Sequence, residues 1–159
     1  MADTDDPATL ARHWLRTTKS GVLSTISTEP GHEGWPFGSI VPFALSQTGV
    51  PHILIASIAM HTKNLVKDPR YSLLVHEREM ESDPQAGWRI TLLGRAQRLA
   101  AHDDTIAEIH ARYLERVPAA ESYLQTHGFD YWRLDVDRVR FIGGFGKIAW
   151  IDAAAVMGP

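Results

Sequence analysis

Two short apolar runs on either side of one polar helical segment, within residues 52–75, constrain the fold more than any other part of the chain. Residues 53–56 (ILIA) and 71–75 (YSLLV) are typical of buried strands. Residues 62–67 are predicted to form a helix that ends at Asp68, because the residue before a proline is disfavoured in the helical conformation. The stretch therefore predicts a strand, a short helix and a second strand of one sheet.

The start of this predicted helix carries polar residues that suit an anion. Ser57, His61 and Thr62 lead into it, and Lys63 and Asn64 lie in its first turn. Exposed backbone N–H groups at a helix start, together with hydroxyl groups and a lysine, can bind a phosphate group. The alternative is that Thr62 or His61 only caps a surface helix.

Most other segments alternate apolar and polar residues as half-buried strands do. Further strands are predicted over residues 22–28, 37–45, 88–99, 129–136, 138–142 and 147–152. Helices are predicted over about 7–17 and within a helical insertion at about 103–127, where Asp103 or Asp104 is the expected cap, and residues 153–159 are expected to be a tail. Gly94 is expected to mark a bulge that bends a long strand. The pattern predicts one mainly β (α+β) domain over residues 1–159, an antiparallel barrel with flanking helices.

Composition narrows the functional classes. The absence of cysteine in 159 residues excludes disulfides and thiolate metal sites and favours a cytoplasmic location. No apolar run approaches the roughly 20 residues that cross a bilayer, and the acidic N-terminus is unlike a signal peptide. The formal net charge of −3 gives no electrostatic reason to expect nucleic acid.

Known catalytic motifs are missing from the sequence. It has no G-x-S-x-G, H-E-x-x-H or phosphate-loop motif, and no helix pattern follows the glycines at 143–146. The eight histidines are scattered, so no metal site is predicted. Arg89 and Lys147 stand at strand ends, where they are either solvated or in contact with a ligand. If the protein is an enzyme, a cofactor is expected to carry the reactive chemistry.

Several segments together resemble the FMN-binding split-barrel proteins related to pyridoxamine 5′-phosphate oxidase, and within them the HugZ-like haem-utilisation branch. The segments that carry the resemblance are 21–25 (GVLST), 36–42 (PFGSIVP), 57–70 (from Ser57 through HTKNL to DPR), 94–96 (GRA), 132–134 (WRL) and 143–146 (GGFG). Their order and spacing carry the resemblance over residues 7–152, because no single motif is diagnostic.

This resemblance implies a six-stranded antiparallel FMN-binding split β-barrel that forms a homodimer, with FMN at the subunit interface and a small-molecule substrate. It implies cofactor contacts from Ser39, Ile40, Val41, Ser57, His61, Thr62, Lys63, Asn64 and Arg89. Lys147 is the candidate on the substrate side.

The sequence also departs from the vitamin B6 oxidases. Ser39 and Ala44 stand where those enzymes place an arginine and a lysine, and Met60 and His61 replace their second basic pair. Vitamin B6 oxidase activity is therefore not predicted. The first hypothesis is a flavin-dependent oxidoreductase with FMN as cofactor, acting on an unidentified small substrate. The alternatives are a haem-binding or haem-degrading protein of the HugZ-like type, whose iron ligand the sequence does not specify, and a dimeric scaffold without a ligand.

Overall fold

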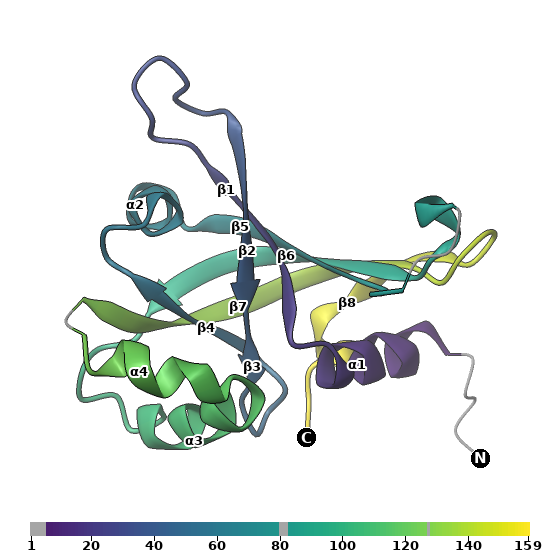
Figure 1. Cartoon of the computed structure of the whole chain (residues 1–159). Helices are drawn as coiled ribbons and strands as arrows, with labels where there is room; N and C mark the ends of the chain where they lie inside the picture. The colour runs from purple at the N-terminus through teal and green to yellow at the C-terminus, as the bar shows by residue number, and fades with distance from the viewer. Residues whose placement is uncertain (1–5, 80–82, 127) are drawn as a thin grey trace.

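One antiparallel sheet forms the centre of the computed structural model, which describes residues 6–79, 83–126 and 128–159 (Figure 1). Its strands follow the order β2-β1-β5-β6-β7-β4-β3, and β8 pairs with β7. The strands are β1 (Ser20–Ile26), β2 (Pro36–Pro42), β3 (Ala44–Leu45), β4 (Pro51–Ala56), β5 (Arg70–His76), β6 (Arg89–Arg98), β7 (Phe129–Ile142) and β8 (Ile148–Asp152). The helices are α1 (Pro7–Thr17), α2 (Met60–Lys67), α3 (Ile106–Arg116), α4 (Glu121–Leu124) and α5 (Ala153–Val156), with 3₁₀ turns η1 (Pro84–Ala86) and η2 (Pro118–Ala120). The predicted mainly β fold with flanking helices is confirmed, although the sheet has eight described strands rather than six.

The predicted strand–helix–strand unit is present as β4, α2 and β5. The two strands do not pair with each other, because β4 pairs with β7 while β5 lies between β1 and β6. The helix begins at Met60, two residues before the predicted start, since the Ala59 carbonyl already accepts hydrogen bonds from the N–H groups of Thr62 and Lys63.

The long strand β7 replaces the two strands predicted on either side of Asp137. Leu93 on β6 pairs with Arg138, and the next residue, Gly94, pairs with Val136, so Asp137 is the bulged residue of one continuous strand. A Cβ atom at Gly94 would lie 1.8 Å from the Asp135 carbonyl oxygen. The sequence therefore predicts the position of the bulge correctly, but the extra residue is on β7. Gly94 allows the β7 backbone to approach β6 closely because it has no side chain.

Helices cover the sheet at separate places (Figure 1). On α1, the side chain of Asp6 caps the helix start by accepting from the Thr9 N–H. Trp14 of this helix stacks on Trp88 and Phe141, with ring centroids 4.3 Å and 5.0 Å away. A second apolar cluster joins α3 to β3, β4 and β7, and its buried members are Ala44, Leu54, Leu99, Ile109, Tyr113, Ala120 and Tyr131.

Two end regions differ from the sequence prediction. Residues predicted as a tail form α5, whose Val156 is buried in the main core, and Arg12 of α1 donates to the Ala155 carbonyl. At α3 the N-cap is Thr105, while Asp103 accepts from Thr105 ahead of the helix. Residue 127, the last of the predicted helical insertion, lies outside the described residues, as do residues 1–5 of the predicted domain. Among the described helices, none has the length and apolar character needed to span a bilayer.

Candidate functional site

The first turn of α2 has no side-chain cap, and its threonine is already occupied. Thr62 is 6% exposed, and its hydroxyl donates to the Ala56 carbonyl at 2.6 Å. The helix N-cap, Ala59, has no side chain that could accept from the first-turn N–H groups. Thr62 therefore neither caps the helix nor presents a free hydroxyl, and the open helix start is flanked instead by Ser57 and Lys63.

Asn64 fastens this helix to the sheet. Its side chain is fully buried, and its Oδ1 accepts from the N–H and the hydroxyl of Thr28, both at 2.9 Å. Its Nδ2 donates to the Thr25 hydroxyl of β1 at 3.0 Å. The structure thus places Asn64 beneath the candidate site rather than at its surface, where it fixes the direction of α2 relative to β1.

A cavity of about 260 Å³ opens beside the first turn of α2. Its walls come from the β4–α2 loop, α2, the end of β6 and the start of β7, with lining residues Ser57, Thr62, Lys63, Val66, Arg98, Asp130 and Trp132. Arg98 forms an ion pair with Asp130 at 2.8 Å. The indole Nε1–H of Trp132 is buried and has no hydrogen-bond partner among the described residues. Lys63 and Arg98 give the cavity two cations against one carboxylate.

Arg98, Asp130 and Trp132 were missed by sequence reasoning. Arg98 lies at the end of β6 and pairs with Trp132 on β7, 34 positions later in the chain. The alternation along residues 88–99 predicts the strand but not which end of it meets α2. Only the register between β6 and β7 brings these side chains beside Lys63, and no local signal in the sequence contains it.

The start of α2 also brings together Ser39 and His61, which the resemblance implied as cofactor contacts. The Oγ of Ser39 and the Nδ1 of His61 are 3.2 Å apart. Burial lowers the pKa of His61, so the neutral imidazole prevails at pH 7. Next to Ser39 on β2, Ile40 is 80% exposed, whereas Val41 is buried in the core. Val41 can therefore reach a ligand only through its backbone.

Arg89 and Lys147 lie at the opposite end of the sheet. Arg89 is at the start of β6, and its Nη1 donates to the carbonyls of Gln85 and Gly87 at 2.9 Å and 3.1 Å. Arg89 pairs with Ile142, which pairs in turn with the residue after Lys147. The nine steps from Arg89 to Arg98 span about 30 Å at about 3.3 Å per residue. One protomer therefore does not bring Arg89 or Lys147 to the α2 cavity.

No group of three or more metal-binding side chains gathers in the part of the chain that the structure describes. The α2 site is instead a donor-rich cavity with a neutral imidazole nearby. Such a site can bind an anionic group, and the imidazole can bind one iron atom of a cofactor that brings its other ligands.

Comparison with known proteins decides the family. The model of the family described as "CREG, beta-barrel" matches residues 2–156. This chain belongs to that family. The chloroplastic heme oxygenase HOZ of Arabidopsis thaliana is 33% identical over 138 residues, which cover 87% of this chain and 40% of HOZ. The heme oxygenase HutZ of Vibrio cholerae is 29% identical over 138 residues, which cover 86% of this chain and 76% of HutZ.

Solved structures agree with this family assignment. A heme binding protein from Mycobacterium smegmatis superposes with a TM-score of 0.84 at 36% identity, over 95% of this chain and 60% of that one. A Clostridium acetobutylicum protein of the pyridoxinephosphate oxidase family superposes with a TM-score of 0.65 at 10% identity, over 94% and 96% of the two chains, which shows the shared split-barrel fold alone. The resemblance to HugZ-like proteins on this fold is confirmed. The chain spans well under half of HOZ and about three fifths of the mycobacterial protein.

Proposed function

We propose that the protein binds haem, with the haem propionates held beside the first turn of α2. The observation that carries the proposal is the cavity in which Lys63 and Arg98 outnumber the single carboxylate of Asp130. Carboxylates are bound well by lysine and arginine donors, which form charge-assisted hydrogen bonds. The unpaired Nε1–H of Trp132 adds a further donor, and an acceptor from a ligand would remove the energetic cost of leaving it unpaired.

Apolar side chains beside this cavity suit the porphyrin ring. Val66 of α2 lines the cavity, and Ile58 follows the lining residue Ser57 on the β4–α2 loop; they are 71% and 82% exposed. Large apolar side chains that gather on a surface mark a binding site more often than isolated ones do. The site therefore offers a flat apolar ligand with carboxylates both kinds of contact that it needs.

His61 is the histidine that we assign to the iron. Its Nδ1 is occupied by Ser39, which orients the ring and leaves Nε2 for a metal. Because burial lowers the pKa of His61, the imidazole is in the form that binds iron. Haem would supply the iron; the chain supplies the imidazole, the cations and the apolar surface.

A homodimer completes the proposal. Phe145, Ile148 and Trp150 are 77%, 57% and 50% exposed and lie with Arg89 at the end of the sheet remote from α2. Most homodimers are twofold symmetric, so the same surface is used by both copies. A second copy in reverse orientation would bring this end, with Arg89 and Lys147, onto the α2 site of the first.

Haem is supported over FMN by the relatives. The names of HOZ, HutZ and the mycobacterial protein all contain heme, whereas FMN is supported only by the shared fold. Two of these relatives are named heme oxygenases, so haem degradation is the activity that we propose for this chain. A cytoplasmic location remains part of the proposal.

The test is a parallel titration of the purified chain with haemin and with FMN, followed by absorbance, with mass measured by light scattering. We expect a shifted Soret band, a dimer, and a weak flavin response. His61→Ala should change the Soret position, whereas the control His13→Ala, on the exposed face of α1, should not. Loss of the Soret band on adding ascorbate in air would support degradation. Tight FMN binding without haemin binding would overturn the proposal.

A further inference from the structure

A second cavity, of about 410 Å³, lies between the β3–β4 turn and α3. It shares none of its lining residues with the α2 cavity, and they are Ser46, Gln47, Thr48, Val50, His52, Thr105, Glu108, Arg133 and Asp135. Its volume is within the range of small-molecule sites. The haem proposal makes no use of it.

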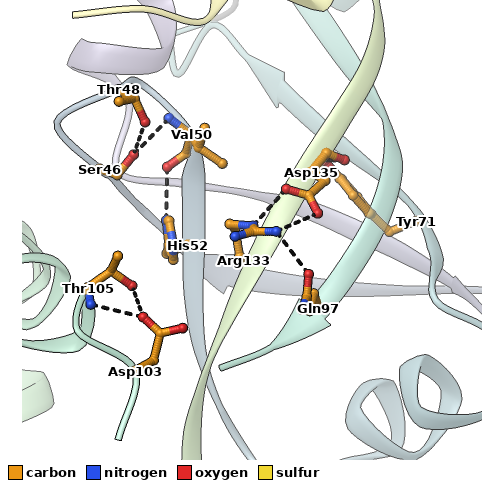
Figure 2. A network of polar contacts seen from close by, with 10 residues as sticks. All are labelled: Ser46, Thr48, Val50, His52, Tyr71, Gln97, Asp103, Thr105, Arg133 and Asp135. Atoms are coloured by element: carbon orange, nitrogen blue, oxygen red, sulfur yellow. Dashed lines mark hydrogen bonds and ion pairs between the residues drawn. The ribbon is translucent and has the colours of Figure 1, made fainter. Parts of the chain in front are cut away.

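His52 on the cavity floor is buried but only half satisfied. The side chain is 3% exposed, and its Nδ1 lies 3.0 Å from the Val50 carbonyl oxygen (Figure 2). Because a carbonyl only accepts, Nδ1 carries the proton and Nε2 is an acceptor. Burial lowers the pKa of His52, which keeps the ring neutral. No hydrogen bond to Nε2 is seen among the described residues, and Nε2 is not one of their enclosed unpaired atoms, so it is an acceptor that the cavity can reach.

Arg133 pairs with His52 across β4 and β7, so both side chains lie on the same face of the sheet. Its Nε and Nη2 donate to the two carboxylate oxygens of Asp135 at 2.7 Å and 3.2 Å, and Nη2 also donates to Gln97 at 2.9 Å (Figure 2). Asp135 balances the charge of Arg133. The guanidinium is therefore held in place and has Nη1 left as a donor.

Acceptors dominate the opposite wall. Glu108 on α3 accepts from the Gln47 N–H at 2.8 Å and from Arg112, both through Oε1, which leaves Oε2 unoccupied among the described groups. The hydroxyl of Thr105 donates to Asp103 at 2.5 Å, so its lone pairs remain as acceptors and the Asp103 carboxylate stands nearby. His52, Glu108 and Thr105 thus each leave an acceptor at the cavity, and its lining carries two carboxylates, Glu108 and Asp135, against the one guanidinium of Arg133.

We propose that this cavity binds a small primary ammonium compound that carries a hydroxyl or carboxylate group at its other end. The ammonium group has three donors, which match His52 Nε2 and the carboxylate of Glu108. The oxygen at the other end accepts from Arg133. The turn that forms one wall is already rigid, since Ser46 Oγ bonds Thr48 Oγ1 and accepts from Val50 N–H, so little ordering is needed on binding.

The test uses the full chain, with binding followed by NMR chemical shifts of the His52 ring. The probes are ethanolamine and glycine, which distinguish a hydroxyl from a carboxylate at the second end. Their controls are 1-propanol and propionate, in which a methyl group replaces the ammonium. We expect at least one of the two amines to shift the His52 signals saturably at millimolar concentration, and both controls to fail.

Glu108→Gln should weaken the amine by at least about tenfold, while Glu121→Gln, the same change on the exposed face of α4, should leave it unchanged. His52→Gln is the second variant. If the His52→Gln protein does not fold, the Glu108→Gln variant is sufficient for the test, because the Glu108 side chain is 37% exposed and its replacement should leave the fold intact. The proposal is overturned if neither amine binds at about 10 mM, if the methyl controls bind equally well, or if both glutamate variants lose binding alike.

Discussion

The amide of Asn64 holds the α2 site in place, and its removal should destabilise the whole domain. The side chain joins α2 to Thr25 on β1 and to Thr28, two residues after the end of β1, through three hydrogen bonds of 2.9, 2.9 and 3.0 Å. Asn64→Ala removes all three and leaves the hydroxyl of Thr25, which is 2% exposed, without this partner.

The expected loss follows from these bonds. A typical intramolecular hydrogen bond contributes about 1 kcal/mol net, and an unsatisfied buried group costs about 1–3 kcal/mol. Thr28 is half-buried, so water can replace part of what it loses. We therefore expect the free energy of unfolding to fall by about 3 kcal/mol. For a chain of this size that corresponds to a decrease in Tm of about 6–12 °C.

Urea denaturation followed by tryptophan fluorescence measures the loss. The midpoint should move while the slope stays unchanged, since a change of slope would mean that the unfolded state had changed. Lys67→Ala is the control because Lys67 is exposed in the last turn of the same helix. If Asn64→Ala lowers the free energy of unfolding by less than about 1 kcal/mol, the structural role is refuted, and Asn64 would again be a candidate for direct ligand contact.

Three further predictions concern stability. Burial holds the pKa of His52 below its ordinary 6.5, so the unfolded chain binds more protons, and the free energy of unfolding should fall on acidification from about pH 7.5 to 5.5. The fall should be less steep in His52→Gln, and calorimetry that shows the same dependence on pH for both proteins would contradict this. Gly94→Ala forces a methyl group against the Asp135 carbonyl and should lower stability by at least about 2 kcal/mol in the same denaturation assay. Trp14→Ala removes the stack on Trp88 and should cost about 3–5 kcal/mol, and a loss near zero would show that α1 does not depend on it.

Local patterns were sufficient to predict most of the elements. The apolar runs of β4 and β5, the proline after α2 and the Asp6-Pro7 start of α1 each act within a few residues, and the structure confirms them. The boundary at Asp137 was wrong because a polar bulge residue in a paired strand looks like a turn in sequence. The helix α5 was missed because its stability comes from Val156 packing on distant parts of the core.

The candidate site was only partly predictable. Ser39, His61 and Lys63 do gather around α2. Arg98 was not found, because strand register is set by packing and by the bulge rather than by neighbouring residues. Arg89 was selected by its place at a strand end and by the family resemblance, and a single protomer keeps it at the far end of β6 from the α2 cavity. Whether it reaches the ligand depends on the second copy, which no pattern within one chain specifies.

The most direct test of haem binding at α2 is the haemin affinity of the double variant Lys63→Ala with Arg98→Ala. Both side chains are exposed at the rim of the cavity, so each should contribute no more than about 1 kcal/mol. We expect the dissociation constant for haemin to rise by about tenfold, since about 1.4 kcal/mol lies within the sum of the two contributions. Arg89→Ala combined with Lys147→Ala should change it only if a partner protomer supplies those residues. An unchanged haemin affinity in the Lys63 and Arg98 double variant would contradict the proposed site.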